Sequence, residues 1–142
     1  MGSMTTVKWI DNRTMLAQTP SGHGLIMDGA PDIGGQNLGP RPMEMILAGL
    51  GGCTSVDVQM ILEKTKQDFR NLEIQITSER AEDHPKVYTK IHLHFVVTGK
   101  DLDPKKVERA ISLSAEKYCS VNAMLKSTAE ITHDFEIVDV AH

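Results

Sequence analysis

The chain has 142 residues, which is enough for a single domain with a sizeable core. It carries 15 Lys and Arg against 19 Asp and Glu, for a formal net charge of −4. This balance argues against nucleic acid as a general partner, because binding phosphates requires a basic face. No signal peptide and no apolar run of membrane-spanning length are expected, so we predict no membrane partner. Residues 1–3, before Met4, are typical of an expression scar, and one domain is predicted over 4–142.

The first part of the chain predicts three short strands separated by turns. The expected strands cover residues 7–10, 14–19 and 24–28. Asp11-Asn12 and Pro20-Ser21-Gly22 supply the turn signals between them, so a small antiparallel meander is expected. Residues 29–41 are rich in Gly, Pro, Asp and Asn, which is typical of an irregular loop.

A long helix is predicted over residues 42–66, with Cys53 at its middle. Its apolar residues follow helical spacing, and Pro42 occupies a first turn, where proline is tolerated. Small residues precede the thiol: Gly49, Gly51 and Gly52. They clear space for close packing or for a substrate. Between residues 43 and 62 the helix is apolar on nearly every side, and such helices are buried all round. We therefore predict an intimate homodimer whose sheets wrap around the paired helices.

The second half of the chain predicts two strands, a second helix and a final strand. Leu72, Ile74 and Ile76 alternate with polar residues, and a second alternating run covers residues 87–97, with His92 and His94 on its polar side. Asp103-Pro104 opens the helix, which reaches a break at residues 118–120 and a short extra helix through residue 125. The last strand covers about residues 129–139. The order of the elements predicts an α+β fold with antiparallel sheets.

The two cysteines, Cys53 and Cys119, both lie at small-residue positions of helical segments. Two thiols without a secretory signal indicate a reducing, cytoplasmic setting, and any bridge between them would be a reaction step. If the thiols meet, the natural chemistry is peroxide reduction through a sulfenic acid and then a disulfide. That chemistry requires a thiolate, for which an arginine oriented by a carboxylate is well suited. A cysteine within a helix is also compatible with inert packing.

The stretch Pro-x-Glu-x-Ile-Leu-Ala-x-x-Gly-Gly-Cys-Thr-Ser at residues 42–55, together with Lys-Tyr-Cys-Ser-Val at residues 117–121, resembles the OsmC/Ohr family, most closely its YhfA-like branch. The resemblance implies an intertwined homodimer. It also implies a peroxidase for small organic hydroperoxides, regenerated by an external dithiol of the lipoyl type, with no cofactor and no metal ion. By this likeness Cys53 is the peroxidatic cysteine and Cys119 the resolving one.

The resemblance also implies a catalytic Glu and Arg. Members of the family place the Glu directly after the helix-opening proline, whereas here Met43 has that position and Glu44 follows it. One residue turns a helical side chain by about 100°. The family's Arg lies on the first hairpin or on the loop before the helix, which selects Arg13 and Arg41. Each of the two also fits an ordinary surface charge.

Other interpretations remain open at the level of the sequence. His92 and His94 share one face of a strand and could chelate a metal, but the spacing indicates no third ligand, and solvent-facing or interface histidines fit the pattern better. The protein could instead be a binding module that holds an apolar ligand in a methionine-rich dimer cleft lined by the cysteines. A third interpretation is a redox sensor, in which formation of the disulfide alters a contact with a partner.

Overall fold

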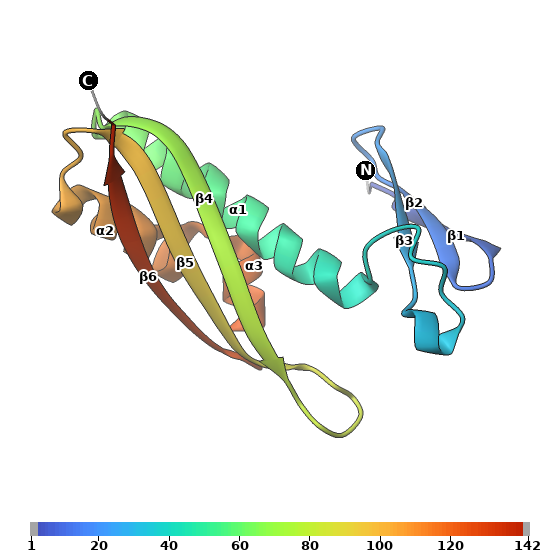
Figure 1. The fold of residues 1–142 in the computed structure, drawn as a ribbon. Helices are drawn as coiled ribbons and strands as arrows, with labels where there is room; N and C mark the ends of the chain where they lie inside the picture. The colour runs from blue at the N-terminus through green and yellow to red at the C-terminus, as the bar shows by residue number, and fades with distance from the viewer. Residues whose placement is uncertain (1–2, 141–142) are drawn as a thin grey trace. The chain divides into compact units, whose positions relative to one another are not determined.

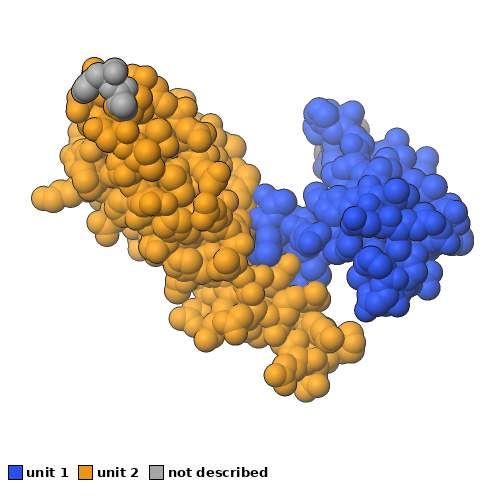
Figure 2. Space-filling model, in the orientation of Figure 1, with its two compact units in different colours: residues 1–48 blue, residues 49–142 orange. Residues whose placement is uncertain are grey.

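The structure is a computed structural model that describes residues 3–140. It divides into two compact units, whose boundary falls between Ala48 and Gly49 (Figure 2). Each unit is described by itself below. A single domain over 4–142 stays a prediction, and the first two residues of the expected scar lie outside the described residues.

The first unit is built on an antiparallel meander, as predicted. Its strands, in the order β1-β2-β3, are Thr6–Asp11, Thr14–Gln18 and Gly24–Asp28. The turn between β1 and β2 uses Asn12 in a left-handed conformation, with φ of 48°, which asparagine tolerates better than most residues. The loop that follows β3 contains one short 3₁₀ turn, η1 (Pro31–Ile33), that the sequence did not predict.

Asp28 organises the loop between the meander and the long helix. Its side chain is fully buried, and its Oδ2 accepts hydrogen bonds from the backbone N–H groups of Gln36 (3.0 Å) and Leu38 (3.1 Å). Burial alone raises the pKa of Asp28, but the hydrogen bonds from Leu38 and Gln36, together with the nearby Thr14 and Gly29, outweigh it and hold the pKa below its ordinary value. The loop is therefore tied to the end of β3 by an ionised carboxylate.

The predicted long helix is α1, Pro42–Lys64 (Figure 1). Its buried residues recur every four positions and form one stripe: Leu50, Thr54, Val58 and Leu62. The expectation of burial on every side is not met within one chain, since Val56 is 53% and Met60 61% exposed. The helix has the length and apolar composition to cross a membrane, so the expectation that no apolar run reaches that length was wrong. The core helix of a globular protein meets the same criterion.

The second unit contains a three-stranded sheet with the order β4-β5-β6 (Figure 1). Its strands are Asp68–Arg80, Tyr88–Lys100 and Glu130–Asp139. The apolar face of β5 forms the core, since four of its residues are at most 2% exposed: Ile91, Leu93, Phe95 and Val97. His92 and His94 point away from this core, as predicted. The helices cover one face of the sheet and leave the other bare (Figure 1).

The direction of the last strand corrects one sequence-based expectation. Strands β4 and β5 pair antiparallel, but β6 pairs parallel to β5, with Phe95 opposite Phe135. The expectation of purely antiparallel sheets was therefore wrong for β6. The reason is the long helical connection after β5, because parallel neighbours need a crossover of a dozen or more residues. The mixed α+β class itself is confirmed.

That crossover consists of three consecutive helical segments, α2 (Pro104–Leu113), η2 (Ser114–Tyr118) and α3 (Ser120–Leu125). Asp103 caps α2, as predicted, because its side chain accepts a hydrogen bond from the backbone N–H of Lys105. The segment η2 is a π-helical turn, which widens the helix just before it stops. Cys119 then adopts an extended conformation and becomes the N-cap of α3. The predicted break and extra helix are confirmed.

Candidate functional site

Cys53 lies midway along α1 and is partly exposed. The glycines before it differ in their surroundings. A methyl group at Gly51 would lie 3.1 Å from Cδ1 of Ile76, so this glycine lets α1 pack closely against β4. Gly49 and Gly52 have no neighbouring atoms within 4 Å of such a methyl group. Absent side chains at these two positions leave the surface open next to the thiol.

Cys119 is buried, with 2% of its surface exposed. Its Sγ accepts a hydrogen bond from the backbone N–H of Asn122 at 3.4 Å, as an N-cap side chain does, and shares one of 3.4 Å with Oγ1 of Thr54. Burial raises the pKa of Cys119, and the nearby Cys53 raises it further, while the bonds with Thr54 and Asn122 lower it by less. The thiol of Cys119 therefore stays protonated to a higher pH than the thiol of an ordinary cysteine.

The two cysteines meet with a third acidic side chain, Asp57. Sγ of Cys53, Sγ of Cys119 and a carboxylate oxygen of Asp57 all lie within 4.8 Å of one another. Oδ2 of Asp57 also accepts a hydrogen bond of 3.0 Å from the hydroxyl of Ser114. Both cysteines are free thiols. The two sulfurs are neighbours in the reduced protein, and they must move together to about 2.05 Å to form a disulfide.

Sequence reasoning did not find Asp57, although a signal was present. Asp57 follows Cys53 by four residues, and side chains four apart share one face of a helix. Ser114 and Thr54 also contact the cluster, but their contribution depends on how α1 meets the segments around η2. No spacing in the sequence indicates such a contact.

Two cavities of the second unit lie beside the cysteine pair. One, of about 560 Å³, is lined in part by Thr54 and Asn122, the two partners of Cys119. The other, of about 660 Å³, is lined by the charged side chains of Asp57, Glu63 and Lys64 together with apolar side chains that include Met60 and Leu113. An apolar molecule therefore has room next to the acidic group that contacts the thiols.

Arg13, Arg41 and Glu44 belong to the first unit, where they make local contacts. Nη1 of Arg13 donates to the backbone oxygen of Asn12, and Nη1 of Arg41 donates to Asn37 Oδ1 and to the backbone oxygen of Gly39. Oε1 of Glu44 accepts a hydrogen bond of 2.8 Å from the backbone N–H of Arg41. This contact caps the start of α1, as a Glu three residues into a helix commonly does. The structure does not assign these three residues to the thiols, and their catalytic roles stay predictions.

Comparison with known proteins identifies the family. The model of the family described as OsmC-like protein matches residues 34–134, a span that contains both cysteines and Asp57. The chain belongs to the OsmC-like family. The resemblance seen in the two cysteine segments is thereby confirmed.

Relatives of this OsmC-like protein share its full length. It is 48% identical over 132 residues to Protein YhfA of Escherichia coli strain K12, covering 93% of this chain and 96% of that protein. A hypothetical protein from Aquifex aeolicus VF5 has a crystal structure with a TM-score of 0.87 at 30% identity, over 99% of each chain. The organic hydroperoxide resistance protein OsmC of Legionella pneumophila has a TM-score of 0.71 at 15% identity, covering 99% of this chain and 98% of that one. The last likeness shows the fold alone.

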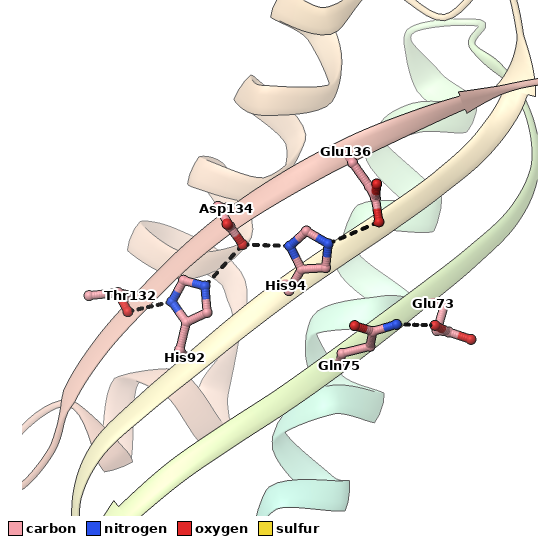
Figure 3. A network of polar contacts seen from close by, with 7 residues as sticks. All are labelled: Glu73, Gln75, His92, His94, Thr132, Asp134 and Glu136. Atoms are coloured by element: carbon pink, nitrogen blue, oxygen red, sulfur yellow. Dashed lines mark hydrogen bonds and ion pairs between the residues drawn. The ribbon is translucent and has the colours of Figure 1, made fainter.

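The OsmC-like chain also carries a polar network on the bare face of its large sheet (Figure 3). The ring nitrogens of His92 form hydrogen bonds with Oγ1 of Thr132 (2.7 Å) and Oδ1 of Asp134 (2.9 Å). Those of His94 form hydrogen bonds with Oδ1 of Asp134 (2.7 Å) and Oε1 of Glu136 (3.1 Å). Asp134 first and Glu136 second raise the pKa of His94, because both stabilise the charged imidazolium. The histidines thus face outward, and each nitrogen already has a partner.

Proposed function

We propose that this protein is a thiol peroxidase that reduces organic hydroperoxides, with Cys53 as the attacking cysteine and Cys119 as the resolving one. The observation that carries the proposal is the approach of the two sulfurs to within 4.8 Å, with Cys53 the more exposed. The attacking thiol must meet substrate, whereas the resolving thiol needs only to reach Cys53. The organic hydroperoxide resistance protein of Legionella pneumophila, which shares the fold, supports this chemistry.

Cys53 is oxidised in two steps, a displacement at the peroxide and then a condensation with Cys119. The Cys53 thiolate attacks the terminal peroxide oxygen, the O–O bond breaks, and the alkoxide leaves with a proton as an alcohol. Cys53 is now a sulfenic acid, oxidised by two electrons. The Cys119 thiol then displaces water from it and forms the Cys53–Cys119 disulfide. An external dithiol, of the lipoyl type, returns both thiols to the reduced state and becomes a disulfide itself.

A positive charge favours the attacking thiolate, and we assign it to Arg13 or Arg41, oriented by Glu44. The cavity beside Asp57 accepts the apolar tail of the hydroperoxide. We place the reaction in the cytoplasm, where thiols stay reduced between turnovers.

The active form that we propose is an intertwined homodimer. In one chain α1 leaves Val56 and Met60 exposed, and Trp9 on β1 is 71% exposed. Large exposed apolar areas of this kind mark interaction surfaces. A second copy of the chain covers them and completes the burial of α1 that its composition predicts.

The experiment adds cumene hydroperoxide to the reduced protein and counts free thiols. We expect both thiols to disappear together, with one intramolecular disulfide per chain. Cys53→Ser should abolish the loss, whereas Cys119→Ser should allow one turnover and leave Cys53 as a sulfenic or higher acid. Persistence of both thiols, or thiol loss that Cys53→Ser does not affect, contradicts the proposal.

A second candidate function is a binding module for an apolar ligand, and the apolar cavity beside Asp57 favours it. This candidate predicts that purified protein retains a lipid-like molecule and consumes no peroxide. A redox sensor predicts oxidation by peroxide without sustained turnover by any dithiol. Steady-state consumption of peroxide with dihydrolipoamide as reductant therefore separates all three.

A further inference from the structure

We propose that the reduced protein binds one Zn²⁺ ion through Cys53, Cys119 and Asp57. All three ligand atoms come from the second unit and lie within 4.8 Å of one another. With Zn–S bonds of about 2.3 Å and Zn–O bonds of about 2.1 Å, neighbouring ligand atoms of a tetrahedral site are about 3.5–3.8 Å apart. The upper limit on the observed separations, 4.8 Å, is only slightly larger than these values, so we expect side-chain rotation to close the site around an ion.

The choice of metal follows from the donor atoms. Two thiolates select borderline or soft cations such as Zn²⁺, and a carboxylate is an accepted third ligand. Mg²⁺ and Ca²⁺ require several oxygen ligands, which this cluster does not supply. Three protein ligands leave the fourth tetrahedral position for water or for a small thiol or carboxylate.

Charge and hydrogen bonding support the same conclusion. The bonds to Asp57 and Cys119 come from neutral groups, namely the Ser114 hydroxyl, the Thr54 hydroxyl and the Asn122 N–H. Two thiolates and a carboxylate this close repel one another, so both thiols ionise together only when a divalent cation balances their charge. The neutral donors act as partners that orient metal ligands and tune their basicity.

Zinc binding and disulfide formation exclude each other. Coordination replaces one thiol proton at each cysteine, so two protons are released and no electron moves. A disulfide has no thiolate to offer the metal. The ion therefore protects the two thiols from oxidation, and its release makes them reactive again. This consequence for activity depends on the proposed peroxidase function, but the binding itself does not.

The test is an anaerobic titration of the full reduced chain with Co²⁺, followed by displacement with Zn²⁺. We expect sulfur-to-cobalt charge-transfer absorption in the near ultraviolet that saturates at one ion per chain and vanishes when Zn²⁺ is added. Histidine and carboxylate ligands cannot produce this band, so binding at His92 or His94 does not interfere. Mg²⁺ should not displace the cobalt, and the oxidised protein should show no band.

Variants assign the ligands. Cys53→Ser and Cys119→Ser should each reduce the band. Ser114→Ala removes a partner that orients Asp57, so it should lower the affinity for Co²⁺ by about 10- to 100-fold. Asp57→Asn should lower that affinity further. Glu108→Gln removes an exposed charge from α2, outside both cavities beside the cysteines, and serves as the control, with no change expected. Circular dichroism confirms that each variant is folded, and Ser114→Ala tests the site even if Asp57→Asn is unstable.

The outcomes separate this inference from the proposed function. Absence of the charge-transfer band, or affinity that neither Asp57→Asn nor Ser114→Ala changes, overturns the zinc site while peroxide-dependent thiol loss can still proceed. A one-to-one band in a protein that peroxide does not oxidise retains the zinc site and rejects the peroxidase. If both hold, a stoichiometric amount of Zn²⁺ should suppress thiol loss, and a chelator should restore it.

Discussion

Thr54 and Cys119 share a hydrogen bond of 3.4 Å that joins the middle of α1 to the start of α3. It is a contact between residues 65 positions apart, and both side chains are buried. Because the bond favours the thiolate of Cys119, it opposes the effect of burial on the pKa of that thiol. The resolving step should therefore depend on Thr54.

Replacement of Thr54 by Ala should raise the pKa of Cys119 further and slow disulfide formation. The measurement is the pH dependence of alkylation of Cys119 by iodoacetamide in a Cys53→Ser background, where only one thiol reacts. Ser55→Ala, which removes a hydroxyl that accepts a hydrogen bond from Gln59, is the control and should leave the profile unchanged. An unchanged profile in Thr54→Ala would show that this hydroxyl does not influence the thiol.

The proposed homodimer predicts that charge on the exposed side of α1 separates the chains. Val56 and Met60 are four residues apart on one face and more than half exposed. Val56→Glu and Met60→Glu should each shift the mass in sedimentation equilibrium from two chains towards one, because a buried unpaired carboxylate is costly. Lys106→Glu, on the exposed side of α2, is the control. A wild-type mass of one chain at micromolar concentration would refute the dimer.

Leu62 tests the burial of the last turns of α1 in the second unit. Its side chain is fully buried, and replacing a buried Leu by Ala typically lowers the free energy of unfolding by about 2–5 kcal/mol. Leu62→Ala should therefore show a clearly lower denaturation midpoint in urea, with the slope unchanged. A loss below about 1 kcal/mol would indicate that this end of α1 does not pack as described.

The histidine network predicts a stability that depends on pH. The pKa of His94 is raised above its ordinary 6.5, so its stabilising contribution is complete below pH 6.5 and is lost as pH rises through the raised value. The pKa of Asp134 is lowered from 3.8, by His94 first and His92 second, so its contribution is complete above pH 3.8 and is lost as pH falls through the lowered value. The network thus stabilises most between these limits.

His94→Asn should therefore destabilise the protein more at about pH 5.5 than at a pH above the raised pKa of His94, where the wild-type imidazole has lost its charge. Urea denaturation at the two pH values measures the difference. His84→Asn, at an exposed turn, is the control for the loss of a histidine. Equal destabilisation at both pH values would show that the ion pairs with Asp134 and Glu136 contribute nothing.

The sequence predicted local features well, because their causes are local. Asp103 and Pro104 mark the start of α2 through capping chemistry, and the alternation from Ile91 to Val97 marks the buried face of β5. The direction of β6 was predicted wrongly, since alternation looks the same in parallel and antiparallel strands. Only the path of the crossover decides it.

The candidate site was predicted in part for the same reason. The family motif identified Cys53 and Cys119, and their proximity is a finding of the structure. Asp57 was accessible through helical spacing, but its bond with Ser114 was not, because that bond spans 57 residues. Similarly, His92 and His94 gave no sign of Asp134, which lies on a strand far along the chain.

The position of Cys119 as the N-cap of α3 makes the first turn of that helix a reporter of the redox state. Its sulfur receives the N–H of Asn122, and a sulfur that swings towards Cys53 to form a disulfide gives up that acceptor geometry. The amide of Asn122 should then exchange with deuterium faster, and its resonance should shift on oxidation. Nuclear magnetic resonance of a single amide would thus follow turnover without any dye or coupled assay.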